Sequence, residues 1–403
     1  MMHVFTRFGG VDELYLCLWL HEESLAFIKQ ELDMNADLKV LTPVHIGTGI
    51  EWQPKFEYVF FKDAGVVAVM DTEKVLGILG EDNLHQWVSC VERKESLLPL
   101  LQKRKPQLKP DDVASLTIRS SGTQEKPVKS LIRSQATGQP MLPGSSLKGA
   151  IRTAVFAELL LSNHELAKRM ENLGRQGGKF IKWDDSQLQS RFFGRNPNED
   201  IFRVFRPGDA HFSGGTETSI IKSVNKYGDD YRIKESLTQV VETIPRGAVA
   251  PFRISIDELV VKRSEKAKKK VLNRNVYLLN DIKRLFSTIK AHTLRLVEDE
   301  IDYWVNSAGN PECIGIYVDE MVEIKNEIKA CSDTECVLRV GWGSGFRFMT
   351  GDWHGEMKER DYDLLVKSLR PRHPVDLIFP KTMRIIDGGT PLGFVKITVK
   401  REA

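Results

Sequence analysis

The segment PGSSLKGAIR, residues 143–152, brings hydroxyl groups and cations to the start of a helix. Proline, glycine and serine in this order are typical of a helix N-terminus, and the apolar residues that follow have helical spacing. The first turn of a helix leaves backbone N–H groups unpaired and carries a partial positive charge. The segment therefore predicts a phosphate-binding site. Four side chains would contribute hydroxyl donors or positive charge to it: Ser145, Ser146, Lys148 and Arg152.

The glycines and lysine of this segment do not have the GxxxxGK[ST] spacing of nucleotide triphosphatases. The backbone of a polyanion, such as a nucleic acid, is therefore the better ligand than a nucleoside triphosphate. The alternative is an ordinary serine-capped helix on which Lys148 and Arg152 are solvated.

Positive charge is concentrated in two runs although the whole chain is nearly neutral. Its 58 Lys and Arg residues are balanced by 55 Asp and Glu residues, which leaves a net charge of +3. Such runs are usually solvated loops, but two of them in a near-neutral chain favour contact with nucleic acid. The first run consists of Arg119, Lys126, Lys129, Arg133, Lys148 and Arg152, and the second of Lys262, Arg263, Lys266, Lys268, Lys269, Lys270 and Arg274.

A third motif, GWGSGFR at residues 341–347, directly follows a predicted strand. Its glycines allow bare backbone to approach a phosphate or a base closely. Further along, residues 380–384 (PKTMR) and 388–394 (GGTPLGF) predict a strand, a turn and a second strand. A purely structural role would be enough to explain this last motif.

The elements that must position these motifs follow from apolar periodicity. The strongest elements have the order strand, helix, strand, strand, helix, strand, which is the βαββαβ order of ferredoxin-like α+β folds. In that fold both helices cover one face of an antiparallel sheet, and the other face is free for a ligand. The strands are expected at 38–41, 201–205, 252–256 and 337–340, and the helices at 147–158 and 278–296.

Several further elements are predicted between the first strand and the first long helix. Residues 57–70 have the pattern of a β-hairpin, Thr72 opens a short helix, and residues 83–101 have helical spacing. Residues 102–138 are polar and rich in Lys, Arg, Ser and Pro. Their length and composition predict an insertion that lies over a folded core.

The composition limits the class of protein. A length of 403 residues predicts two or three structural units. The five cysteines form no CxxC pair, which argues against a zinc ribbon and a disulfide framework. The longest N-terminal apolar run, Leu14–Leu20, is short and follows two acids, and no run is long enough for a membrane helix. We therefore expect a cytoplasmic protein.

Five motifs together resemble a known family. HIGTG after the first strand, PGSSLKGAIR, ETIPRG, GWGSGFRF and PLGFVKI occur in the order found in the RAMP superfamily of CRISPR effector proteins, and are most similar to subunit five of the type III-A Csm complex. The resemblance implies a modified RRM-type core at residues 36–350, which includes a helical and basic insertion at 72–138 and a thumb hairpin at 211–241. A C-terminal extension at 351–403 would carry the PLGF motif.

The resemblance also implies partners and site residues. The partners would be crRNA, target RNA contacted by the thumb, other Csm-complex backbone subunits and host trimming nucleases, with no cofactor, no metal and no membrane. The thumb would wedge apolar side chains between bases. The RNA-binding residues would be Ser145, Ser146, Lys148, Arg152, Gly343, Ser344 and Arg347, with Ile220 and Tyr227 from the thumb.

The same resemblance bears on catalysis. Backbone subunits of such complexes cut target RNA with an aspartate in the loop after the first strand, but here residues 46–56 contain no aspartate and Glu51 is their only acid. His45 is a candidate general base without a second catalytic partner. We therefore expect a noncatalytic subunit that caps the 3′ end of the guide and supports its maturation. The alternatives are a ribonuclease of RAMP fold that uses His45 or Glu51, and a type III-B RAMP subunit.

Overall fold

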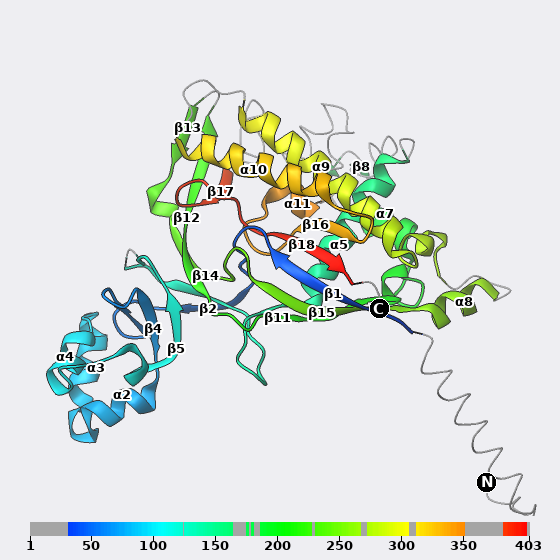
Figure 1. Ribbon diagram of the computed structural model, residues 1–403. Coiled ribbons are helices and arrows are strands. Elements are labelled where there is room, and N and C mark those ends of the chain that lie inside the picture. Colours follow the sequence, from blue (N-terminus) through cyan, green and yellow to red (C-terminus); the bar gives the residue numbers. More distant parts are fainter. Residues whose placement is uncertain are drawn as a thin grey trace, which may run out of the picture.

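The computed structural model describes residues 31–400 except 124, 164–174, 177–178, 181–185, 228–229, 267–271, 306–311 and 351–381. Within this part the fold is a mixed α+β arrangement built on a five-stranded sheet and a nine-stranded sheet, with long helices along one side and a small helical lobe at one end (Figure 1). Two two-stranded ribbons complete the strands: β7 (Met141–Leu142) with β11 (Ala210–His211), and β8 (Arg175–Gln176) with β9 (Lys179–Phe180).

The five-stranded sheet forms the centre of the molecule, and all its neighbouring strands are antiparallel. Leu38 pairs with Ala250 on one side and with Ile397 on the other, and all three side chains are buried. Asp33, Asn35 and Lys39 alternate with buried residues and are exposed, so the two faces of the first strand differ. The strand order is β10 (Phe205–Pro207), β15 (Val249–Asp257), β1 (Glu31–Val40), β18 (Phe394–Val399) and β16 (Glu335–Arg339).

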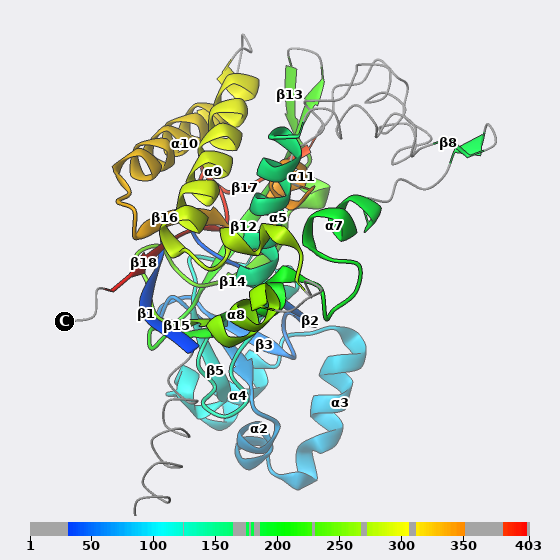
Figure 2. The same cartoon turned by 90° about the vertical axis from the view of Figure 1, so that its right-hand side faces the viewer.

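Three long helices pack beside this sheet: α5 (Gly144–Leu161), α9 (Ile282–Val305) and α10 (Glu312–Ala330). The apolar residues of α5 have the predicted helical spacing, and Leu147, Ile151 and Ala154 join the main hydrophobic core with strands β1, β15 and β18. A second core contains residues of α9, α10, β16 and the nine-stranded sheet. Helices α9 and α10 therefore connect the two sheets (Figure 2).

The sheet departs from the simple βαββαβ arrangement, which is not confirmed. The order β10-β15-β1 is the one that a ferredoxin-like fold requires, but β18 lies between β1 and β16. Because β18 is antiparallel to both neighbours, β16 runs parallel to β1. The added helix α10 explains the reversal, since it returns the chain along α9 before β16 begins. The C-terminal extension thus contributes a central strand of the core.

The nine-stranded sheet collects strands from distant parts of the sequence. Its long strand, β12 (Glu217–Tyr227), pairs with β14 (Gln239–Thr243), β5 (Ala114–Arg119), β13 (Asp230–Ile233) and β17 (Thr382–Ile386). The order along the sheet is β2-β6-β14-β12-β5-β4-β3, in which the remaining strands are β2 (Gly47–Trp52), β6 (Val128–Leu131), β4 (Val66–Met70) and β3 (Tyr58–Phe61).

The helical lobe contains the helices predicted from Thr72 and at 83–101, and the segment after it contributes two strands. The hairpin β3–β4 and the helices α2 (Thr72–Leu79), α3 (Leu84–Arg93) and α4 (Leu98–Arg104) share a separate hydrophobic cluster. Asp71 accepts hydrogen bonds from two N–H groups of the first turn of α2, which explains why that helix begins at Thr72. Residues 102–138, predicted to be an insertion over the core, include β5 and β6, which are strands of the nine-stranded sheet.

A second local difference concerns the strand predicted at 201–205. Residues Ile201–Arg203 form a 3-10 turn, and the strand β10 begins only at Phe205. The Asp200 carboxylate accepts a hydrogen bond from Phe202 N at 2.8 Å, which favours the turn over an extended backbone. The remaining elements are α7 (Ser186–Phe193), α8 (Glu258–Lys266) and α11 (Gly345–Thr350), with 3-10 turns at Glu81–Asn83, Pro110–Asp112, Glu235–Leu237 and Arg274–Leu278.

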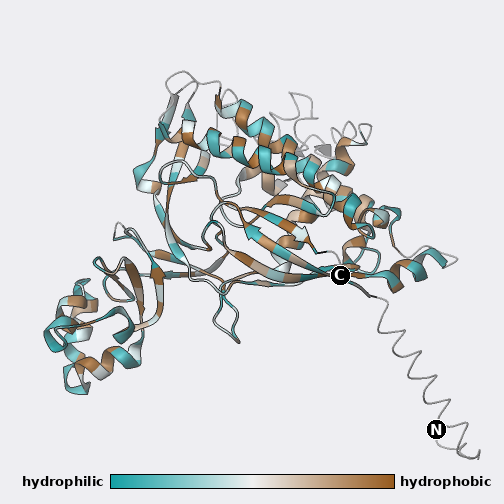
Figure 3. Ribbon diagram, viewed as in Figure 1, coloured by the Kyte–Doolittle hydropathy of each residue, from teal (hydrophilic) through white to brown (hydrophobic). Residues whose placement is uncertain are grey.

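Hydrophobic and hydrophilic residues alternate around the long helices, as Figure 3 shows for α9 and α10. Helix α9 contributes apolar residues to both cores, and α10 contributes them to the second core. Among the described residues no helix is long and apolar enough to cross a membrane.

Candidate nucleic-acid interface

The start of α5 is fixed by a close backbone contact. Pro143 is the extended N-cap residue, and Gly144 N donates a hydrogen bond to Asp209 Oδ1 at 2.7 Å. A Cβ atom on Gly144 would lie 2.0 Å from the carbonyl oxygen of Pro207, so only glycine fits here. Asp209, which the sequence analysis did not select, therefore takes one of the free N–H groups of the helix. The one feature of the sequence that marks Asp209 is its place at the end of the turn sequence RPGD.

Three of the four predicted side chains remain available at this helix start. Ser145 is exposed, and Ser146 and Lys148 are half-buried. Burial lowers the pKa of Lys148, and the nearby Asp200 carboxylate opposes this shift. Lys148 has no hydrogen bond or ion pair with any described residue, which distinguishes it from most half-buried cations. An anion from outside the chain would compensate it.

Arg152 is directed into the protein instead. Its Nη1 atom lies 2.9 Å from Asp200 Oδ2, and its Nε donates to Gln189 Oε1 at 3.4 Å. The guanidinium also lies over two aromatic rings, 4.2 Å from the centroid of Phe193 and 5.2 Å from that of Phe202. The guanidinium of Arg152 is thus held by hydrogen bonds at its N–H groups and by aromatic rings at its flat faces. It anchors α5 to the segment around Asp200.

The glycine loop after β16 packs against the backbone next to the HIGTG motif. Gly341 has φ +82°, and a Cβ atom there would lie 2.5 Å from the carbonyl oxygen of His45. Ser344 is 3% exposed, and its hydroxyl donates to Gly341 O at 2.6 Å. Gly343 is buried against Leu392. The loop therefore folds on itself, and the predicted residues Gly343 and Ser344 close this turn.

Trp342 presents the aromatic surface of the same loop. It meets the His45 ring edge-on at 5.9 Å between centroids, and two cations lie near its own ring, Arg384 at 4.9 Å and Lys129 at 5.9 Å. Arg384 is exposed and has no carboxylate partner among the described residues. In the sequence, Arg384 is part of the PKTMR motif, which was interpreted as a strand and not as a binding site.

Arg347, on α11, contacts the same aromatic ring as the hairpin of β12 and β13. Its guanidinium is 5.0 Å from the ring centroid of Tyr303, near the end of α9. On the hairpin itself Lys226 is almost fully buried, and its Nζ lies 4.2 Å from the same ring and donates to Tyr303 O at 3.0 Å. Tyr303 therefore joins the glycine-loop segment to β12.

A hairpin lies within residues 211–241, the predicted thumb, and the apolar side chains of β12 beside it are packed. Strands β12 and β13 pair from Val224–Ile233 to Tyr227–Asp230. Ile220 is half-buried against a cluster of the nine-stranded sheet, and the neighbouring Ile221 is 1% exposed. The Tyr227 side chain lies outside the described residues, as do Lys268, Lys269 and Lys270. RNA contact by Ile220 stays a prediction that would require it to leave this packing.

The two candidate catalytic residues already have partners. His45 is 2% exposed, its Nδ1 lies 2.6 Å from the carbonyl oxygen of Glu242, and burial lowers its pKa. Glu51 lies on β2, the strand at one edge of the nine-stranded sheet, and its Oε1 is 3.1 Å from Lys129 Nζ. Within the described ranges no group of three His, Cys, Asp or Glu residues could hold a metal ion.

Comparisons with known proteins agree with this architecture. The family model of the RAMP superfamily matches residues 37–347. A chain in the cryo-EM structure of a Csm-crRNA-target RNA ternary complex, from a type III-A CRISPR-Cas system, has 20% identity and a TM-score of 0.68, with 91% of this chain and 100% of that chain covered. The crystal structure of T. onnurineus Csm5 has 20% identity and a TM-score of 0.59, with 89% and 99% covered. No curated protein matches the chain.

Proposed function

Because the chain belongs to the RAMP superfamily, we propose that it is a noncatalytic, crRNA-binding subunit of a type III-A CRISPR effector complex. Both similar structures come from Csm proteins, and the alignment covers each of them almost completely. At 20% identity these similarities establish a common fold. The proposal extends that fold to a role with the site residues of this chain.

The observation that carries the proposal is the start of α5. Lys148 is half-buried beside a helix N-terminus and has no ion pair among the described residues, because the nearby Asp200 carboxylate is paired with Arg152. The exposed hydroxyl of Ser145 lies in the same turn. A phosphodiester would supply the missing charge and accept hydrogen bonds from the hydroxyl groups, without reading the base. Such a site suits a guide RNA whose sequence varies.

A position at the 3′ end of the guide is the finer part of the proposal. The helical lobe of α2, α3 and α4 extends from one end of the nine-stranded sheet (Figure 1). Such an addition is compatible with a subunit that ends a filament, because a repeating subunit needs both ends free for its neighbours. The open side would hold the 3′ segment and admit host trimming nucleases.

The contacts of His45 and Glu51 support a role without catalysis. A general base must be accessible to the proton that it removes. His45 is buried with one ring nitrogen at a backbone carbonyl, and Glu51 is paired with Lys129. Neither residue has a second acid–base group placed to act with it among the contacts described above. We therefore assign both to the structure of the sheet.

Guide length in a deletion strain tests the assignment. Without this subunit, guides should keep an intermediate, untrimmed 3′ length while the 5′ region stays bound by the other subunits. Re-expression of the wild-type chain should restore the mature length. A normal distribution of mature guides in the deletion strain would remove both the 3′ position and the maturation role. Incubation of the purified chain with labelled RNA, with and without divalent metal, tests the ribonuclease alternative, which predicts cleavage.

A further inference from the structure

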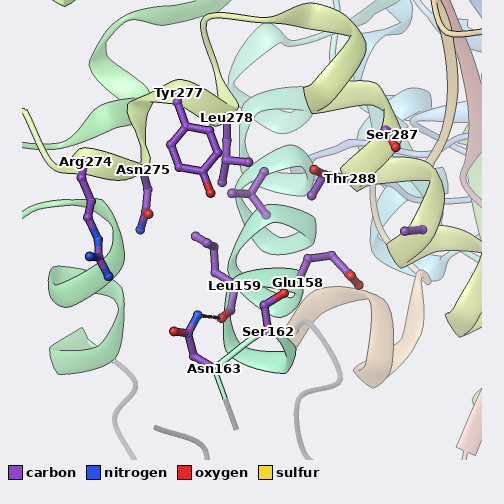
Figure 4. A pocket seen from close by; sticks show the side chains of 12 residues that line it. Glu158, Leu159, Ser162, Asn163, Arg274, Asn275, Tyr277, Leu278, Ser287 and Thr288 are labelled. Carbon is purple, nitrogen blue, oxygen red and sulfur yellow. Dashed lines mark hydrogen bonds between the residues drawn. The ribbon is translucent and has the colours of Figure 1, made fainter. Parts of the chain in front are cut away.

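A cleft of about 720 Å³ lies where the last turns of α5, the 3-10 turn Arg274–Leu278 and α9 meet. Figure 4 shows its lining, with Tyr277 on the 3-10 turn opposite Leu159 and Asn163 of the α5 end. Leucine side chains form part of the wall, and hydroxyl and amide groups form the rest. This mixture suits a ligand that has both a flat apolar face and polar edges.

Tyr277 is an exposed aromatic ring on a rigid support. It is 44% exposed, whereas its neighbours Val276 and Leu278 are buried. The turn is fixed to the end of α7 by two side-chain amides, Asn275 Nδ2 to Phe192 O at 3.0 Å and Asn273 Nδ2 to Arg191 O at 2.8 Å. A ring held in this way loses little conformational freedom when a second ring stacks on it.

Two arginines bring positive charge to the Tyr277 side of the cleft. Arg284 lies with its guanidinium carbon 5.3 Å from the Tyr277 ring centroid, and Arg274 lines the cleft. In the part of the chain that the structure describes, neither side chain has a carboxylate partner. Glu158, the acid in the lining, is paired with Arg295 at 3.4 Å, so the protein compensates its charge.

We propose that this cleft binds a nucleotide of single-stranded RNA, with the base stacked on Tyr277 and phosphate groups at Arg274 and Arg284. Aromatic stacking combined with arginine is a common way to hold single strands without sequence preference. Asn163 Nδ2 donates to Leu159 O at 2.6 Å and the Thr288 hydroxyl to Arg284 O at 3.1 Å. The Ser162 hydroxyl and the oxygen atoms of Asn163 and Thr288 would contact the sugar and the base edges. Arg274, the last residue of the second basic run of the sequence, is the member of that run that lines the cleft.

The inference rests on the proposed RNA-binding function and adds a contact that it does not contain. The cleft is at the C-terminal end of α5, whereas Lys148 is near the N-terminal end, roughly 20 Å away along the helix. One strand of a few nucleotides could reach both. The two contacts can therefore be removed separately.

The test measures binding of a fluorescent twelve-nucleotide single-stranded RNA to the full chain by anisotropy. We expect Tyr277→Ala to weaken binding about tenfold, and Tyr277→Phe to keep it, because the stacking ring remains. Arg274→Ala with Arg284→Ala should lower affinity and reduce the salt slope by between about one and two. The matched control is Arg93→Ala with Lys103→Ala, which removes the same charge from the helical lobe and should change neither quantity.

Two results would overturn the cleft assignment. One is unchanged affinity in Tyr277→Ala and in the double arginine variant while Lys148→Ala weakens binding, which leaves the proposed function intact. The other is binding of 5′-AMP to the wild type that Tyr277→Ala abolishes while the RNA affinity of the same variant is unchanged, which would assign the cleft to free nucleotides. Failure of the wild type to bind RNA would instead contradict the proposed function. Photo-crosslinking of 4-thiouridine RNA to the wild type, expected at the Tyr277 peptide, requires no variant to fold.

Discussion

Trp342 N donates a hydrogen bond to the carbonyl oxygen of His45 at 2.9 Å, although the two residues are far apart in the sequence. His45 follows β1 of the central sheet, and its ring nitrogen contacts Glu242 O on β14 of the other sheet. The glycine loop and the HIGTG motif, which the sequence analysis treated separately, therefore form one joint between the two sheets. Gly341 lies so close to the same carbonyl oxygen that even a methyl side chain at this position would collide with it.

Alanine at Gly341 should destabilise the protein more than alanine at Gly345. Both glycines have positive φ, +82° and +84°, so each substitution costs about 1–2 kcal/mol in backbone strain. Only at Gly341 would the new Cβ atom also meet a backbone oxygen, at 2.5 Å, whereas nothing lies within 4 Å of Gly345. Thermal denaturation of the two variants measures the difference. Equal melting temperatures would show that the joint adapts without cost.

Lys148→Ala should weaken RNA binding without unfolding the protein. Because Lys148 has no hydrogen bond or ion pair among the described residues, its loss removes no internal polar interaction. The slope of log affinity against log salt should fall by nearly one, as for one lost phosphate contact. Anisotropy titrations at several salt concentrations provide this slope. Lys103→Ala, an exposed lysine on α4, is the control and should keep the wild-type slope.

Arg152→Ala should behave in the opposite way to Lys148→Ala. The variant loses the ion pair with Asp200 and the stacking on Phe193, so we expect a loss of about 2 kcal/mol of stability. RNA affinity of the folded variant should stay near that of the wild type. Thermal denaturation and anisotropy on the same samples separate the two effects. Weaker RNA binding with unchanged stability would show that the guanidinium faces the RNA after all.

His292 should make stability fall as the pH decreases below neutrality. It is 4% exposed, and burial, together with the nearby Arg295, lowers its pKa from 6.5 to about 3. Between these two values the unfolded chain binds a proton that the folded chain does not, so acid favours unfolding. The loss from this group is about 2 kcal/mol between pH 7 and pH 5.

The dependence of melting temperature on pH tests this prediction in a His292→Gln variant. The variant should show a shallower dependence than the wild type over pH 5–7, whatever its absolute stability. His85→Gln is the control, because His85 is exposed and its loss should leave the slope unchanged. A steep wild-type slope that survives in His292→Gln would assign the effect to another group. Glu158 is not that group, because burial raises its pKa and its protonation in acid would favour the folded chain.

A reconstituted effector complex that carries Glu51→Ala or His45→Ala should cut target RNA at the same positions as the wild-type complex. Glu51 is paired with Lys129, and His45 is buried, so neither is placed for catalysis in the proposed role. Gel mapping of the cut sites measures this outcome, once assembly of each complex has been verified. Loss of a single cut from an intact complex would revive the ribonuclease alternative.

Local patterns predicted the individual elements well. The helix at 147–158, the hairpin at 57–70 and the strand at 252–256 all occur with longer or slightly shifted bounds, because apolar spacing and turn residues determine such elements locally. The pairing of distant strands was not predictable in this way. Nothing in the alternation of residues 394–399 indicates that this strand lies between β1 and β16.

In the candidate site, too, residue types were predictable from the sequence and contacts between distant segments were not. The sequence selected the start of α5 from residue types, and Lys148 there has no hydrogen bond or ion pair among the described residues, so its RNA contact stays a prediction. It also selected Arg152 and Ser344, whose partners come from other segments and direct them inward. Periodicity cannot show that Asp200 lies beside Arg152, since the contact joins elements almost fifty residues apart. Residue types and spacing identify which side chains could bind a phosphate. Tertiary contacts decide which of them are not already used inside the protein.

The place of β18 has a consequence for how the chain is made. A ribosome completes β1 and β16 well before it reaches Phe394. Until β18 is synthesised, the position between β1 and β16 in the central sheet is empty. During synthesis two strand edges are unpaired, and such edges pair readily with other chains. A stop codon before residue 394 would make that exposure permanent. We would therefore expect nonsense variants that remove only β18 to accumulate as aggregates rather than as shortened, soluble subunits.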